Sequence, residues 1–593
     1  MRLEQWETFK RGPFYGAGFM CFTGLFVLLA LIPTVLAVKP ESATATVSSS
    51  PPFIMDMVYP NPGEPAPKTE FLNPELLKRW GFNGNVPREF VQCAITYDSL
   101  DKGIFPVGSE ERKWVENNAR QTDQIIAAMK AQGLPCYPFT DFIVLPRVMI
   151  EKYKTEICDP EGHIDIHRPK TQEIVRVMID EIFRRFPDLG GITLRHGETY
   201  LHDTPYHAGG NPILHGPDSH VELLKLLREE ICVKRNKVLF YRTWDFGNMH
   251  DKSEYYLSVT DQVEPHPKLF FSIKHQLGDF HRLSCFNPCL GIGKHRQIVE
   301  VCCQLDSYGK GAYPYYNGQG VLDGWEEYAG QAGMHGLREL AKNPLYAGTW
   351  TWSRGGGWSG PFITNEFWCE LNTYVCARWA QNPERTEEDA FNEFAHKIAG
   401  IKDAQNLSRF RKIALLSASG TLRSENSLIQ KLDVWWNRDQ FFDACLMSGL
   451  QQVVKDGKMD AFLAEKATST AMWQEIEKLG SELQVPDPKL AKFIRISCTY
   501  GRIKCEIIEQ MCTVALLGLT GDAEHSYDKA RIKAALATYD RLWEEWRALR
   551  TANPDDCATL YETGGFNCGL VNKGAKQNPG MGDIMAKYRA LTK

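Results

Sequence analysis

The chain has 593 residues, 68 Lys and Arg against 73 Asp and Glu, and a formal net charge of −5. This length exceeds what one hydrophobic core usually supports, so we expect two folded domains after an N-terminal appendage. The weak negative charge, with no run of Lys and Arg among aromatic residues, argues against a nucleic-acid partner. The 15 Trp are typical of proteins that stack sugar rings and equally of large cores.

The N-terminus carries an apolar segment. No charged residue lies between Arg11 and Lys39, and residues 17–38 are long and apolar enough to cross a bilayer. Basic residues precede the segment, which favours a cytoplasmic N-terminus and export of the rest of the chain. Small residues near Ala37 resemble a cleavage site, so we interpret residues 1–38 as a signal peptide or a retained signal anchor. The protein is therefore expected to be extracellular or periplasmic, either free or anchored to the membrane.

The next part of the chain predicts a barrel. Residues 39–89 begin rich in Ser, Thr and Pro, and we interpret them as a linker and lead-in. From Phe90, apolar runs alternate with amphipathic helices, which predicts a parallel sheet. The expected strands are FVQCAIT, LPCYPFTDF, GITL, KVLFYRTWDF, KLFFSIKH, RQIVEVCCQ and LYAGTWTW. Their span, residues 90–360, is close to the roughly 250 residues of a (β/α)8 TIM barrel, with the eighth strand expected between Ser307 and Leu340.

Helices are expected between these strands and throughout the C-terminal part. Those of the barrel are predicted over Trp114–Gln132, Thr171–Phe186, His220–Glu230 and Asp323–Ala341. Beyond the barrel, apolar residues step by threes and fours from Ile496 to Val514 and from Ile532 to Leu549. Residues 361–593 are therefore predicted to form an all-helical C-terminal domain. The 17 cysteines are scattered, and we expect buried thiols with at most a few disulfides.

Side chains that follow the strands supply the candidate chemistry, because the catalytic groups of a parallel barrel stand at the carboxyl ends of its strands. The residues at these positions are Asp98, Asp141, Arg195, Glu198, Arg242, Trp244, Asp245, Lys274, Asp279, Asp306, Trp350, Trp352 and Arg354. Carboxylates can protonate a leaving oxygen and activate water, cations can neutralise an acidic substrate, and aromatic rings can stack on a sugar. This combination predicts a glycoside hydrolase.

Several stretches, taken in chain order, resemble the α-glucuronidases of glycoside hydrolase family 67. GITLRHGE resembles the strand that ends in the general-acid Glu, VLFYRTW the Arg-bearing strand, and SIKHQLGDF the Ile-Lys and Asp-Phe pattern. VCCQLDSYGKG stands where the family has Gln-Glu-Tyr, and GTWTWSRGGGWSGPF where it has Asn-Trp-Thr-Gly-His. The resemblance implies an enzyme that removes α-linked glucuronic acid, or its 4-O-methyl ether, from xylan-derived oligosaccharides with inversion.

The resemblance also implies roles for residues. Glu198 would be the general acid, Asp279 and Asp306 would activate water, and Arg242 and Lys274 would bind the uronate carboxylate. The further candidates for substrate binding are Arg195, Trp244 and Trp352. No cofactor and no metal is expected. The expected partner is an oligosaccharide or polysaccharide that bears a uronic acid, with a homodimer as a candidate assembly.

The chain departs from the family pattern in three places. It lacks the family's N-terminal β-domain, Asp306 replaces the base Glu, and Gly360-Pro361 stands where the family has Gly-His. An inverting enzyme needs its acid and base carboxyls about 6.5–9.5 Å apart, which residues on separate strands of a barrel mouth can provide. Glu198 has to stay protonated, whereas Asp279 and Asp306 have to hold at least one negative charge between them.

Two other functions are compatible with parts of the pattern. The tetrapeptide RHGE also occurs in histidine phosphatases, in which case His196 would accept a phosphoryl group. That mechanism needs a second histidine, and His335 lies in a helix-like segment instead of after a strand. A non-catalytic carbohydrate-binding barrel is the other alternative, because Asp306 is one methylene shorter than the family's base.

A group of histidines follows the GITL strand. Its members are His196, His202, His207, His215 and His220. Their irregular spacing and the absence of HExxH predict solvated loop histidines and no metal site.

Overall fold

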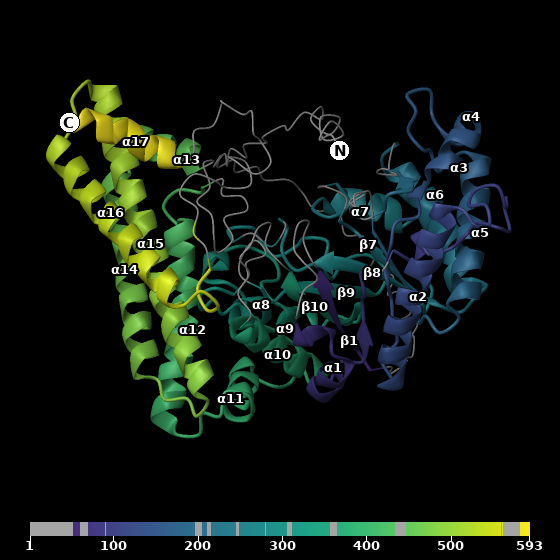
Figure 1. The fold of residues 1–593 in the computed structure, drawn as a ribbon, viewed down its shortest axis with the longest axis horizontal. Helices are drawn as coiled ribbons and strands as arrows, with labels where there is room; N and C mark the ends of the chain where they lie inside the picture. Colours follow the sequence, from purple (N-terminus) through teal and green to yellow (C-terminus); the bar gives the residue numbers. More distant parts are fainter. Residues whose placement is uncertain are drawn as a thin grey trace, which may run out of the picture. The chain divides into compact units, whose positions relative to one another are not determined.

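The structure is a computed structural model that describes residues 51–593, apart from residues 60–68, 89, 196–203, 210–214, 245–247, 279, 281, 305–310, 356–364, 433–445, 559 and 561–580. Ser50–Lys593 forms one compact unit, and Figure 1 labels most of its helices and several of its strands. The candidates Glu198, Asp279 and Asp306 lie outside the described residues. So does the apolar segment 17–38, whose membrane or signal role stays a prediction. Within the described ranges, no helix is long and apolar enough to span a membrane.

Eight parallel strands form one sheet, in the order β2-β1-β10-β9-β8-β7-β5-β3. They are β1 (Phe53–Tyr59), β2 (Gly84–Asn85), β3 (Phe139–Thr140), β5 (Gly191–Leu194), β7 (Val238–Arg242), β8 (Leu269–Lys274), β9 (Gln297–Cys302) and β10 (Tyr346–Gly355). The two edges of the sheet meet, because the Asn85 N–H donates to the Pro135 carbonyl (3.0 Å) and the Tyr137 N–H donates to the Asn85 carbonyl (2.9 Å). The sheet therefore curls into the predicted barrel.

The first two strands lie earlier in the chain than predicted. Strands β1 and β2 and helix α1 (Pro74–Trp80) all fall within residues 39–89, the expected linker and lead-in. The run FVQCAIT, expected to be the first strand, contains instead a short 3-10 helix, Val91–Cys93. Strand β1 was missed because a charged residue, Asp56, interrupts its apolar pattern, and β2 because two residues give no periodicity.

The prediction of a strand between Ser307 and Leu340 is also wrong. The described part of this segment, residues 311–340, forms α8 (Gly318–Asp323), a 3-10 turn (Glu326–Tyr328) and α9 (Leu337–Leu340). The long helix predicted over Asp323–Ala341 is thereby corrected to short pieces. The eighth strand of the barrel is β1, which pairs with β10.

Asp56 is buried where β1 pairs with β10. Its carboxylate accepts hydrogen bonds from the hydroxyls of Thr351 (2.5 Å) and Ser353 (2.8 Å). Burial raises the pKa of Asp56 to about 7, and the hydrogen bonds from Thr351 and Ser353 oppose this rise only in part. A carboxyl that is neutral over much of the acidic range thus joins the first barrel strand to the last.

We expect Asp56→Asn to make the stability of the protein less dependent on pH. The pKa of Asp56 is raised in the folded state above its ordinary value of 3.8. Its contribution to stability is therefore fully present below about pH 4 and is lost as the pH rises through about 7. Urea unfolding at pH 5 and pH 8 should show a smaller loss of stability in the variant than in the wild type. An equal loss in both proteins would contradict this assignment.

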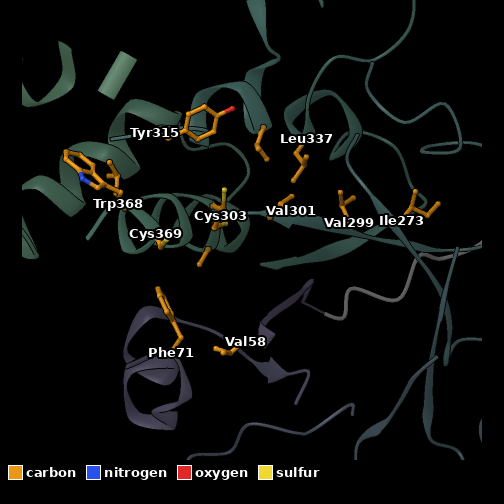
Figure 2. Close-up of a cluster of buried hydrophobic side chains, with 14 of the residues drawn as sticks. Val58, Phe71, Ile273, Val299, Val301, Cys303, Tyr315, Leu337, Trp368 and Cys369 are labelled. Carbon is orange, nitrogen blue, oxygen red and sulfur yellow. The ribbon is translucent and has the colours of Figure 1, made fainter. Parts of the chain in front are cut away.

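Large side chains fill the barrel. Those that point inward are Met55, Met57, Phe139, Phe240, Phe270, Ile298, Trp350 and Trp352. The outward residues of the same strands pack against the surrounding helices. Figure 2 shows part of this outer core, with Val58 of β1, Ile273 of β8 and Val299 and Val301 of β9 drawn together with Leu337 and Trp368 from the helices. Two separate apolar layers thus hold each strand in place.

Helices cover the barrel much as predicted. Helices α2 (Glu110–Ala131), α5 (Pro169–Arg185) and α6 (Pro217–Leu227) confirm three predicted helices with shifted ends. The other elements of this part are α3 (Arg147–Lys152), α4 (Lys154–Ile157), α7 (Ser253–Thr260), α10 (Phe367–Gln381), a 3-10 turn (Glu70–Leu72), a π-helical segment (Arg228–Val233) and a small antiparallel strand pair, β4 (Leu145–Pro146) with β6 (His207–Ala208).

Helices also make up the described residues beyond α10. They are α11 (Glu387–Lys397), α12 (Ala404–Glu425), α13 (Leu446–Lys455), α14 (Met459–Glu482), α15 (Pro488–Glu524), α16 (Lys529–Ala552) and α17 (Met581–Leu591). Helices α12, α14, α15 and α16 pack in succession (Figure 1). The apolar stripe predicted within α15 is buried, and the one within α16 is buried from Ile532 to Trp543, whereas Trp546 and Leu549 are only partly buried. Tyr313 joins this part to the barrel, because its ring contacts Trp473 and Tyr500 at centroid distances of 5.4 and 6.2 Å.

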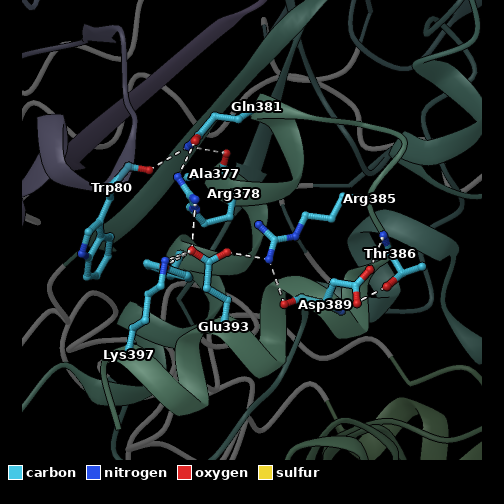
Figure 3. A network of polar contacts seen from close by, with 10 residues as sticks. Trp80, Ala377, Arg378, Gln381, Arg385, Thr386, Asp389, Glu393 and Lys397 are labelled. Atoms are coloured by element: carbon cyan, nitrogen blue, oxygen red, sulfur yellow. Dashed lines mark hydrogen bonds and ion pairs between the residues drawn. The ribbon is translucent and has the colours of Figure 1, made fainter. Parts of the chain in front are cut away.

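A polar network ties α1, α10 and α11 together (Figure 3). Glu393 of α11 pairs with Arg378 (3.0 Å), Arg385 (2.5 Å) and Lys397 (2.7 Å). Partial burial alone would raise the pKa of Glu393, but its hydrogen bonds, that from Lys397 first, lower the pKa to about 2. The Gln381 side chain donates to the Trp80 carbonyl (2.7 Å). The C-terminal end of α10, the helix that follows β10, is thus fixed to both α1 and α11.

The cysteines are mostly buried, as predicted. All cysteines that the structure describes are free thiols, and of these only Cys285 is partly exposed. The few disulfides allowed for in the sequence analysis do not form within this part of the chain.

Candidate active site

Three cationic side chains enter the barrel at neighbouring strand ends. Arg195 follows β5, Arg242 ends β7 and Lys274 ends β8, and each is at most 2% exposed. The guanidinium carbons of Arg195 and Arg242 lie 5.8 and 5.3 Å from the centre of the Phe139 ring. The two arginines therefore converge on one side chain of β3, across the mouth of the barrel.

Aromatic rings surround the ammonium group of Lys274. Its Nζ lies 3.6 Å from the ring centre of Trp244, 4.8 Å from Phe280 and 5.8 Å from Trp352. Trp352 also contacts Arg242, whose guanidinium carbon is 5.2 Å from the indole. Desolvated cation–π contacts of this kind contribute about 2 kcal/mol. The structure thus brings together the predicted substrate-binding residues Arg242, Lys274, Trp244 and Trp352.

Glu300 is a member of this site that the sequence analysis missed. It lies in β9, is fully buried, and accepts hydrogen bonds from Arg242 Nε (2.8 Å) and from the Ser272 hydroxyl (2.9 Å). A charged residue inside the apolar run QIVEVC was the available signal. A buried carboxylate in this place fixes the guanidinium of Arg242, because the two groups form a charge-assisted hydrogen bond in a water-poor interior.

Two histidines, His250 and His275, lie next to residues of the cationic site. The His250 ring lies 4.9 Å from that of Trp244, and Asn287 donates from its side chain to the His250 carbonyl (3.0 Å). His275 follows Lys274, and its N–H donates to the Glu300 carbonyl (3.0 Å). Burial lowers the pKa of His275 to about 4, so its ring is neutral near pH 7. The uncharged ring adds no further positive charge beside Lys274.

The histidines after β5 differ from the prediction of solvated loop residues. His207 is fully buried, and burial lowers its pKa to about 3. His220 is also buried and is hydrogen-bonded to the Tyr241 hydroxyl (2.8 Å). His215 is solvated, as expected, whereas His196 and His202 lie outside the described residues. Tertiary packing, which a single sequence does not reveal, decided the burial of His207 and His220.

His335, the second histidine of the phosphatase alternative, lies between α8 and α9. Its Nε2 is 2.9 Å from the Gln331 carbonyl. This segment leads into the start of β10, which is the opposite end of the barrel from the cationic site. The position of His335 therefore gives no support to a phosphoryl-transfer site.

No family model matches the chain, and no curated protein matches it in sequence. A solved GH138 enzyme targeting the pectin rhamnogalacturonan II is similar in structure, with 10% identity and a TM-score of 0.56, over 91% of this chain and 66% of that one. This chain therefore spans slightly less than two thirds of the GH138 enzyme. At this identity, the likeness shows a common fold.

Two further solved structures are more distant. A mutant O-GlcNAc hydrolase from Thermobaculum terrenum matches 91% of this chain and 94% of its own, with 10% identity and a TM-score of 0.36. Dispersin B matches 56% of this chain and 98% of its own, with 11% identity and a TM-score of 0.33. The GH138 enzyme is not described as an α-glucuronidase, so its likeness to this chain supports a shared fold and not family 67 in particular.

Proposed function

We propose that this protein is a glycoside hydrolase that removes an α-linked uronic acid, such as glucuronic acid or its 4-O-methyl ether, with inversion. The observation that carries the proposal is the convergence of Arg195, Arg242 and Lys274 with Trp244 and Trp352 at the mouth of the barrel. Buried cations of this kind suit a carboxylate, and indole rings suit the apolar face of a sugar.

In this proposal, the catalytic carboxylates come from the loops that follow the described strands. Glu198 follows β5 and acts as the general acid, whereas Asp279 follows β8 and Asp306 follows β9, and these two activate water. In the sheet, β7 lies between β5 and β8. Since neighbouring strands are about 4.8 Å apart, β5 and β8 are separated by roughly 10 Å. A spacing of this order leaves room for the attacking water that inversion requires.

The test is proton NMR of the full chain with 4-O-methylglucuronosyl xylo-oligosaccharides. Initial release of the β-anomer of the free uronic acid is the expected result, because inversion converts an α-linkage into a β-product. Release of phosphate from a phosphomonoester, with no sugar released, would favour the mechanism through His196. Saturable binding of the oligosaccharide without turnover would favour the non-catalytic barrel. Either outcome would overturn the proposal.

Lys274→Met is expected to lower kcat/KM for the acidic substrate by roughly 10- to 150-fold. A hydrogen bond to a charged group is worth about 1.5–3 kcal/mol, and each 1.4 kcal/mol is about a factor of ten. The uronic acid methyl ester, which lacks the negative charge, should be cleaved by the variant and the wild type at similar rates. The measurement is the ratio of kcat/KM for the acid to that for the ester.

Lys237→Met is the matched control for this substitution. Lys237 precedes β7 at the far end of the barrel, where its ammonium group donates to the Pro187 (2.9 Å) and Leu189 (2.6 Å) carbonyls. The acid-to-ester ratio should be unchanged in this variant. If Lys274→Met also leaves the ratio unchanged, Lys274 does not bind the carboxylate.

A further inference from the structure

A second group of metal-ligating side chains lies outside the cationic site. Asp165 and His167 stand just before α5, and His215 stands just before α6. His167 Nδ1 is 3.0 Å from Asp165 Oδ1, and His215 Nε2 is 3.7 Å from Asp165 Oδ2. The ligand atoms of all three residues lie within 4.8 Å of one another. Two loops that are distant in sequence thus bring a carboxylate and two imidazoles to one point.

These separations fit a tetrahedral ion. Zn²⁺ binds His nitrogen and carboxylate oxygen at about 2.0–2.2 Å, so two ligands at tetrahedral corners are roughly 3.3–3.5 Å apart. The two observed separations, 3.0 and 3.7 Å, fall on either side of this value. Small rotations of the two imidazoles, whose side chains are 31% and 54% exposed and whose ring centres lie 5.2 Å apart, would close the difference.

The carboxylate of Asp165 is largely buried and is oriented by a backbone hydrogen bond. Its side chain is only 9% exposed, and Oδ1 accepts a hydrogen bond from the His167 backbone N–H (2.9 Å). Arg168 is the competing cation, with its Nε 3.9 Å from Oδ2, at the outer limit for an ion pair.

We propose that Asp165, His167 and His215 bind one divalent transition-metal ion, for which Zn²⁺ has the best-suited chemistry. Mixed imidazole and carboxylate ligands suit Zn²⁺ and related ions better than Mg²⁺ or Ca²⁺, which prefer oxygen alone. The ion links the loop before α5 to the loop before α6. Both loops lie at the end of the barrel where the strands terminate, so the ion joins two loops beside the mouth of the barrel. This site is independent of the proposed glycosidase activity.

The test is Zn²⁺ binding by the tag-free full chain after treatment with a chelator, measured by isothermal titration calorimetry. We expect about one equivalent to bind, with His167→Ala and His215→Ala each weakening the affinity at least tenfold, since loss of even a supporting group costs 10–100-fold. The matched control is His163→Ala. His163 pairs with Asp159 at 3.1 Å in the same region, but no third ligand from the described part of the chain completes that pair.

A second measurement uses Co²⁺ in place of Zn²⁺. Its visible absorption reports the nitrogen ligands directly, and the band should change in His167→Ala and His215→Ala and persist in His163→Ala. Both ligand histidines are partly exposed, so these variants should keep the wild-type circular dichroism spectrum. Failure of the wild type to bind Zn²⁺ would overturn the proposal, and so would equal affinities for the wild type and all three variants.

Discussion

Glu198→Gln is expected to lower kcat on a glucuronosyl oligosaccharide by about 10²–10⁴-fold, because a positioned general acid contributes a factor of this size. Gln has nearly the same shape as Glu but has no acidic proton to give to the leaving oxygen. Substrate binding should persist, since the cations and indoles of the site are unchanged. The assignment of Glu198 comes from the resemblance of GITLRHGE to a strand that ends in a general-acid Glu, and Glu198 stands three residues after Arg195, whose side chain enters the barrel.

The leaving group distinguishes an acid from a structural residue. A 4-nitrophenyl glycoside needs little protonation as it departs, so Glu198→Gln should retain most of its activity on this substrate. Glu156→Gln is the control, because Glu156 is exposed on α4, and it should behave like the wild type on both substrates. An equal loss on both substrates in Glu198→Gln would mean that Glu198 shapes the site, and undiminished turnover would assign the acid to another residue.

Strand prediction succeeded where long apolar runs formed the barrel. Strands β5, β7, β8, β9 and β10 coincide with predicted runs, because a strand buried on both faces is apolar throughout. Strand β1 failed this criterion because Asp56 is buried between β1 and β10 as a hydrogen-bonded carboxyl. FVQCAIT had the right composition for a strand but none of its long-range pairing, which only the tertiary structure decides.

The sequence likewise predicted some residues of the candidate site and missed others. Inspecting the carboxyl end of each strand was enough to find Arg195, Arg242, Lys274 and Trp244, because parallel strands present these ends at one edge of the sheet. That procedure could not find Glu300, since Glu300 lies within a strand and belongs to the site only through its contact with Arg242. Likewise, nothing in the sequence around His207 reveals that Phe105 and Trp114 enclose its ring, at centroid distances of 5.7 and 5.8 Å.

Arg242→Met is expected to lower the free energy of unfolding by about 3–5 kcal/mol, because removing one partner of a buried ion pair leaves the other charge uncompensated. Arg242 and Glu300 are 1% and 0% exposed and 2.8 Å apart. Urea unfolding gives the change as a shift of the midpoint at constant slope. Lys113→Met is the control, since the Lys113–Glu110 pair is exposed, and such pairs contribute about 0–1 kcal/mol.

The double variant Arg242→Met with Glu300→Met tests the cause of this loss. Replacing both members of a buried ion pair with apolar residues is often neutral, so the double variant should recover most of the stability that Arg242→Met loses. Its activity should stay low, because the carboxylate of the substrate would still lack Arg242. If the double variant is no more stable than the single one, the loss arises from the packing of Arg242 against Phe139 and Trp352. The stability and the activity of the double variant therefore separate the structural role of Arg242 from its proposed role in binding. Only the ion-pair explanation predicts that stability recovers while activity stays low.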